Sequence, residues 1–260
     1  LARGAAGPQY ERFGPSVMVE AVDTYVALVM SGTHDGLLAV TGAERTELLA
    51  ALAYTLANLV DNGDPGVPGH AQLVLDRRVR DMLVFVAADA DAPQKRALIR
   101  ELTEALSLAR AKRPRENIAL SLAELGERTV LSLDGLSEMQ NSRRPWRAAF
   151  GAMGLAKLGL RRGYDNLAHA LQQDEGTAYP AASLLAELGD SGMSALSKRL
   201  QVQAQLPQLR ADVERVLRAY DPRNCLEERY ARHLLTCLNG PCRALSDDVF
   251  SQVAPASSVR

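Results

Sequence analysis

A pattern of alanine, leucine and glycine that returns three times constrains the fold of this chain more than any other feature. Each copy reads A-x-x-L-A-x-L-G, and its first leucine is Leu122, Leu155 or Leu185, so the copies stand 33 and then 30 residues apart. Residues three and four apart share one face of an α-helix, so each copy predicts a helix with an inner face of leucine and small side chains. The closing glycine predicts the end of that helix, because glycine takes the left-handed backbone conformation at low steric cost.

A second amphipathic segment follows each closing glycine. The apolar residues of these segments are, in chain order, Val130, Leu133 and Leu136, then Leu167 and Leu171, then Met193, Leu196 and Leu200. A pair of helices built from about 30 residues cannot bury its apolar side alone, but it can when it stacks on similar pairs. Residues 116–202 are therefore predicted to form successive helical hairpins.

The third copy, LAELGD at residues 185–190, resembles the end of the first helix in HEAT repeats, particularly the short HEAT-like form of phycobilin-lyase-type proteins. The resemblance covers about residues 116–202. It implies an all-α, α-α superhelix, a HEAT-like solenoid of roughly five to six helical hairpins. In this division, residues 1–115 form divergent N-terminal hairpins, residues 116–202 the clear repeats, and residues 203–260 a helical cap with a cysteine-containing segment and a short tail.

Caps and periodicity predict helices outside the clear repeats as well. Thr41 and Glu44 match a capping box, and Pro93 suits the first turn of a helix. The predicted helices span residues 16–30, 41–60, 70–88, 93–111, 207–219 and 225–238. No segment shows the alternating pattern of a β-strand, so the whole chain is predicted to be all-α.

Composition excludes several classes of protein. The 260 residues are 47% hydrophobic, which is too apolar for a disordered chain, and three cysteines are too few for a disulfide-dense miniprotein. No apolar run reaches the roughly 18 residues that cross a bilayer. The compartment stays open, although Leu1 in place of an initiator methionine and the CLNGPC segment favour an extracytoplasmic (periplasmic or secreted) location.

Basic residues concentrate in the middle of the chain, where residues 110–162 carry 11 basic and 5 acidic side chains. This basic segment, the charge island, has three interpretations. In decreasing order of weight, they are solvated loop charge, a surface for an acidic protein partner and a surface for nucleic acid. A net charge of −1 for the whole chain disfavours nucleic acid. Trp146 is expected to pack against the hairpin end more than to stack on bases. The candidate partner-binding residues are Arg113, Arg115, Arg143, Arg144, Trp146, Arg147, Arg161 and Arg162.

HEAT-like solenoids bind by shape and charge, so the resemblance implies a non-catalytic protein-protein interaction scaffold or adaptor. Its partner would be another protein, which it would bind either alone or as a subunit of a larger assembly. The alternative is a nucleic-acid-binding or DNA-lesion-processing protein, since HEAT-like DNA glycosylases grip phosphate backbones with Arg and Lys. A lyase-like role on a bulky chromophore is suggested only by the repeat subtype. The chain lacks the usual nucleophile, metalloprotease, phosphate-loop and dinucleotide motifs, so we expect no catalytic residue and no cofactor.

The cysteines allow three arrangements. Cys225, His233, Cys237 and Cys242 follow the spacing C-x7-H-x3-C-x4-C. Reduced or buried thiols are the first interpretation. One disulfide is the second, either between Cys237 and Cys242 or between Cys225 and one of them, and a tetrahedral zinc site is the third. Asp61 and Asp64 could chelate calcium, but they lack the spacing of a twelve-residue calcium loop.

Overall fold

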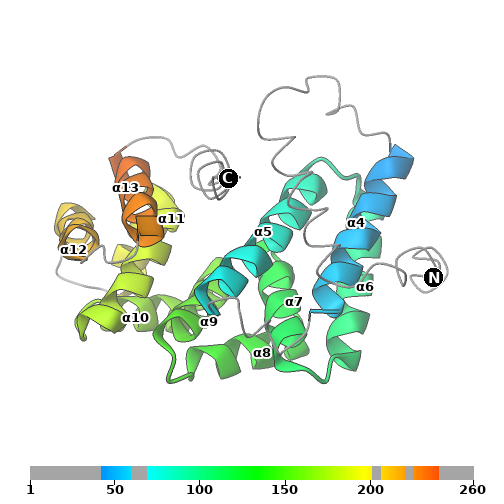
Figure 1. Ribbon diagram of the computed structural model, residues 1–260, viewed down its shortest axis with the longest axis horizontal. Coiled ribbons are helices and arrows are strands. Elements are labelled where there is room, and N and C mark those ends of the chain that lie inside the picture. The colour runs from blue at the N-terminus through cyan, green and yellow to red at the C-terminus, as the bar shows by residue number, and fades with distance from the viewer. Residues whose placement is uncertain (1–41, 60–68, 201–205, 221–224, 240–260) are drawn as a thin grey trace, which may run out of the picture. The chain divides into compact units, whose positions relative to one another are not determined.

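The computed structural model describes residues 42–59, 69–200, 206–220 and 225–239, and all regular structure in these ranges is α-helical (Figure 1). The helices are α4 (Gly42–Ala57), α5 (Gly69–Ala88), α6 (Ala92–Leu108), α7 (Lys112–Glu124), α8 (Val130–Gln140), α9 (Pro145–Lys157), α10 (Arg161–Ala170), α11 (Glu175–Leu200), α12 (Leu206–Ala219) and α13 (Cys225–Asn239). A kink divides α11 into two helices, which makes eleven helices in the described ranges. The all-α prediction is confirmed for this part of the chain.

Most predicted helices lie close to their expected bounds. The helix expected over 93–111 ends earlier, because α6 stops at Leu108 and α7 begins at Lys112. It also begins earlier, since Asp91 accepts a hydrogen bond from the backbone N–H of Gln94 (2.7 Å) and donates its own N–H to the Gln94 side chain (3.0 Å). This reciprocal capping box fixes the start of α6. The helix expected over 16–30 and the predicted cap Thr41 lie outside the described residues.

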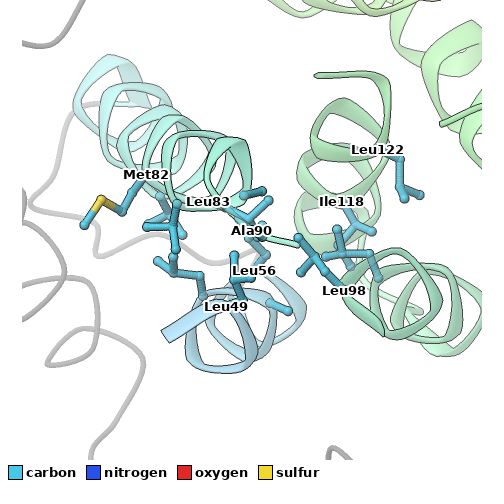
Figure 2. Close-up of a cluster of buried hydrophobic side chains, with 14 of the residues drawn as sticks. Leu49, Leu56, Met82, Leu83, Ala90, Leu98, Ile118 and Leu122 are labelled. Atoms are coloured by element: carbon cyan, nitrogen blue, oxygen red, sulfur yellow. The ribbon is translucent and has the colours of Figure 1, made fainter. Parts of the chain in front are cut away.

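The chain divides into two compact units, residues 1–136 and 137–260, and the border falls within α8. In the first unit, α4 packs against α5, α6 and α7. Figure 2 shows the resulting cluster, in which Leu49 and Leu56 of α4 face Leu83 of α5, while Leu98 and Ile118 from α6 and α7 close the other side. Burial of these side chains stabilises the unit by the hydrophobic effect.

In the second unit, α9, α10 and α11 all contact one another, and α12 and α13 pack against α11 and against each other. Over the described helices of the two units taken together, most contacts join helices that are neighbours in the sequence, although in the first unit α4 also packs against α6 and α7, and α5 against α7. Such sequential packing is consistent with a helical array.

The three copies of the sequence pattern have similar surroundings. Their first leucines, Leu122, Leu155 and Leu185, are all fully buried. The two alanines of each copy are at most 2% exposed, and they are Ala119, Ala123, Ala152, Ala156, Ala182 and Ala186. The predicted face of leucine and small side chains is therefore the inner face in every copy.

All three closing glycines have positive φ, at 77° for Gly126, 74° for Gly159 and 54° for Gly189. In the first two copies, the N–H after the glycine bonds back to the first leucine's carbonyl oxygen, at 2.8 Å for Leu122 and 2.9 Å for Leu155. These bonds form the Schellman motif, which satisfies carbonyl groups at a helix end. The predicted helix ends are thus confirmed in both copies.

The third copy differs after its glycine. Gly189 has a ψ of −154°, and helical structure resumes directly, so that α11 continues to Leu200. The expected second helix is therefore present, but a kink at one residue replaces the turn of the other copies.

The start of α10 lies very close to α9. A Cβ atom added at Gly163 would overlap the backbone carbonyl oxygen of Ala152 and the backbone nitrogen of Ala156. These neighbours are backbone atoms of α9, so they cannot give way as a side chain would. The small residues of the pattern therefore let two helices meet backbone to backbone.

We expect Gly163→Ala to lower the free energy of unfolding by about 1–3 kcal/mol, because the added methyl group forces α9 and α10 apart. Gly42→Ala is the control, since the nearest neighbour of a Cβ there would be Nε2 of Gln94, at 4.0 Å. Urea denaturation followed by circular dichroism measures both variants. Equal unfolding free energies for the two would contradict the close contact.

Candidate partner-binding surface

A hollow of about 350 Å³ lies in the second unit, between the end of α8, α9, α10 and the start of α11. Its floor is apolar and is formed by Pro145, Ala148, Ala149, Ala152, Leu167 and Ala170. Polar side chains surround this floor: Gln140, Ser142, Arg143, Asn166, His169, Gln173 and Thr177. Its volume lies within the range of ligand pockets, about 300–1,000 Å³.

The turn before α9 brings Arg143 to the hollow. Ser142 donates its backbone N–H to the carbonyl oxygen of Met139 (2.9 Å), and its side-chain oxygen accepts the N–H of Arg144 (3.2 Å). Pro145 then begins α9 with a backbone preset for the first helical turn. The side chains of Arg143 and Arg144 are both exposed, but only that of Arg143 lines the hollow.

Two other candidate arginines bind groups of α8. Arg147 forms an ion pair with Glu138 (3.1 Å), and its side chain is only 13% exposed. Arg162 donates from Nη2 to the hydroxyl of Ser137 (2.6 Å), and its carbonyl oxygen accepts from the side-chain amide of Gln140 (3.1 Å). These contacts fasten α8 to the starts of α9 and α10.

The remaining arginines of the island differ in exposure. Arg161 pairs with Asp165 one turn later in α10 at 3.5 Å, and both side chains are largely exposed. Arg115 is half-buried in α7. Exposed helical pairs of this kind contribute about 0.3–0.5 kcal/mol, so the Arg161 pair adds little to stability.

Arg113 belongs to a buried polar network in the first unit, between α5 and α7. Its guanidinium holds the Asp76 carboxylate with two hydrogen bonds, at 2.8 and 2.5 Å. Asn117 donates to the same carboxylate (2.9 Å) and accepts from the guanidinium of Arg80. Asp76, Arg80 and Asn117 are each at most 5% exposed.

Burial dominates the electrostatics of this network. Desolvation lowers the pKa of the Arg80 guanidinium from its ordinary value, while the nearby carboxylates Asp81, Asp76 and Glu124 act in the opposite direction. Arginine remains protonated in proteins, so Arg80 is a buried cation. This network was not predicted from the sequence, although the spacing of Asp76 and Arg80 by one helical turn is a signal of a shared polar position.

Replacing Asp76 with alanine removes the carboxylate that pairs with Arg113 and one of the three carboxylates near the buried Arg80. We expect the free energy of unfolding to fall by about 3–5 kcal/mol, as it does when one partner of a buried pair is removed. Asp134→Ala removes an exposed carboxylate of α8 and should change the same quantity by about 0.5 kcal/mol or less. Chemical denaturation of both variants tests the difference, and a small effect at Asp76 would show that the network carries little stability.

Trp146 lies in an aromatic cluster of the second unit. Its ring contacts Tyr179 edge-on, with the centroids 5.7 Å apart, and Phe150 at 6.0 Å. Tyr179 is 1% exposed and stacks on Tyr220 at 3.8 Å. These contacts agree with the expectation that Trp146 packs at the start of its helix.

Near the end of α13, Cys237 is disulfide-bonded, and its sulfur lies 3.5 Å from Nε2 of His233. The first interpretation, reduced thiols, is therefore wrong for Cys237. Cys242 and the side chain of Cys225 lie outside the described residues, so the pairing with Cys242, or with Cys225, stays a prediction. Asp61 and Asp64, the calcium candidates, lie outside them too. In the described ranges, no group of three His, Cys, Asp or Glu side chains is placed to hold a metal ion.

With Cys237 in a disulfide, two of the three cysteines are oxidised. Protein purified without reductant and then unfolded in guanidinium should therefore react with one equivalent of Ellman's reagent. After reduction and desalting, all three thiols should react. Three reactive thiols before reduction would contradict the disulfide.

No described helix is both long and apolar enough to cross a membrane. Comparison of the chain with protein-family models, with curated proteins and with solved structures finds no match. The resemblance to HEAT repeats therefore rests on the sequence pattern.

Proposed function

We propose that the chain is a non-catalytic, HEAT-like scaffold or adaptor that binds another protein through its second unit. The binding surface consists of α10, the second helix of its hairpin, together with the arginine-containing turn before α9. A partner bound there would contact both the hollow and its rim.

The architecture is inferred from the three pattern copies. In each, the first leucine is fully buried and the closing glycine has positive φ. Helices that are neighbours in the sequence account for most packing contacts. These properties support a solenoid in which each hairpin buries its apolar face against the next.

The binding surface is inferred mainly from Arg143 and Arg144. Both side chains are exposed, and among the described residues neither forms an ion pair. By contrast, Arg113, Arg147 and Arg162 bind oxygen atoms of this chain. Exposed arginines beside a hollow are common in interfaces, where arginine is enriched and forms forked hydrogen bonds with carboxylates.

Charge reversal tests the proposal. The chain serves as bait in an extract of its source cells, and a recovered partner is then purified and its affinity measured. Arg143→Glu with Arg144→Glu should weaken that affinity about tenfold or more, because like charges across an interface repel.

Arg110→Glu with Arg128→Glu is the matched control. It makes the same change in net charge at two exposed positions of the first unit. Unchanged affinity in the turn variant would overturn the proposed surface, as would equal losses in both. If treatment of the extract with nuclease abolishes recovery of the partner, the chain binds nucleic acid instead.

A further inference from the structure

The hollow carries a one-sided electrostatic character. Among the described residues that line it, one is Arg, one is His, and none is Asp or Glu. This absence is notable because the chain as a whole has 31 acidic residues. The hollow therefore offers hydrogen-bond donors and a fixed positive charge to a negatively charged group.

Of the four carboxylates within two residues of the lining, Glu138, Asp165 and Asp174 have contacts of their own, whereas Glu175 is exposed at the start of α11. Glu138 pairs with Arg147 at 3.1 Å, and Asp165 pairs with Arg161 at 3.5 Å. Asp174 accepts hydrogen bonds from the backbone N–H and the hydroxyl of Thr177, at 3.2 and 3.1 Å. Arg143 itself forms no ion pair among the described residues, so its charge is available to an external carboxylate.

We propose that the hollow binds an acidic peptide segment of a protein partner. One carboxylate of the segment pairs with Arg143, and an adjacent apolar side chain lies against the half-buried Pro145, Ala148 and Ala170. The inference rests on the proposed function and names the chemistry of the partner at the same surface.

The floor favours a peptide over a small inorganic anion. An inorganic anion would meet Arg143 but would leave the half-buried apolar surface of Pro145, Ala148 and Ala170 without an apolar partner. The side-chain amides of Asn166 on α10 and of Gln173 in the turn after it supply both donors and acceptors, which is what the backbone of an extended peptide requires.

The site is also ordered before binding. The turn that carries Arg143 is held by the hydrogen bonds of Ser142, and Gln140 donates to the carbonyl oxygen of Arg162 at 3.1 Å. Groups already held in place lose less conformational entropy on binding, which favours affinity.

The probe is a short fluorescein-labelled peptide of alternating glutamate and leucine, titrated into the full chain and followed by fluorescence anisotropy. A matched peptide with glutamine in place of glutamate is the first control. We expect the acidic peptide to bind about tenfold or more tightly than its neutral counterpart, because only it carries the carboxylate for Arg143.

Two variants locate the site. Arg143→Gln should lower the affinity for the acidic peptide about tenfold. Arg144→Gln makes the same change in charge, but at a residue that does not line the hollow, so it should lower that affinity by less than about twofold. Ala148→Phe fills the floor and should abolish binding. Because Arg143→Gln alters an exposed side chain, it remains informative even if Ala148→Phe impairs folding.

Several outcomes would overturn the inference. These are equal binding of the two peptides, equal losses at Arg143 and Arg144, full binding by a folded Ala148→Phe variant, and tighter binding of inorganic phosphate or an oligonucleotide. If the Ala148→Phe variant no longer binds the peptide but binds the purified protein partner with full affinity, the acidic-peptide inference fails while the proposed function stands. If the charge reversal at Arg143 and Arg144 leaves the partner's affinity unchanged, the proposed function itself fails.

Discussion

The close contact between α9 and α10 is the constraint on which the second unit depends. Gly163 lies against the backbone of Ala152 and Ala156, so no side chain fits between the helices at this point. Ala152 also lines the hollow. The small residues that let the helices meet thus continue beyond the contact, where they leave a shallow space with an apolar floor. Packing and the candidate site are consequences of the same side-chain sizes.

Periodicity predicted the helices of this chain well, because the leucine and alanine positions record which face is buried. The glycines at 126, 159 and 189 were also readable, since positive φ at a helix end has a clear sequence signal. The kink at Gly189 could not be predicted from the sequence, because the direction of the chain after the glycine depends on how the next helix packs. Local sequence specifies that a helix ends but not the direction in which the chain continues.

The candidate site could be predicted only in part from the sequence, for a related reason. The sequence did not distinguish among the candidate arginines of the charge island, but in the structure Arg113 lies in a network with Asp76, which is 37 residues away in the sequence. Arg147 and Arg162 likewise bind groups of α8. A count of charges cannot separate such arginines from Arg143, because the difference lies in tertiary contacts. The residues of α10 that line the hollow carried no sequence signal beyond their place on a second helix.

The junction at Gly189 limits how this part of the chain can vary. In the first two copies, several residues separate the paired helices, and such connections tolerate changes in length. At Gly189 one residue alone sets the angle between the two halves of α11. An inserted residue would rotate the following helix by about 100° and turn its apolar face away from the core, since an α-helix has 3.6 residues per turn. Variation in length must therefore be accommodated elsewhere, and new surface features can arise at the other turns more readily than at this one.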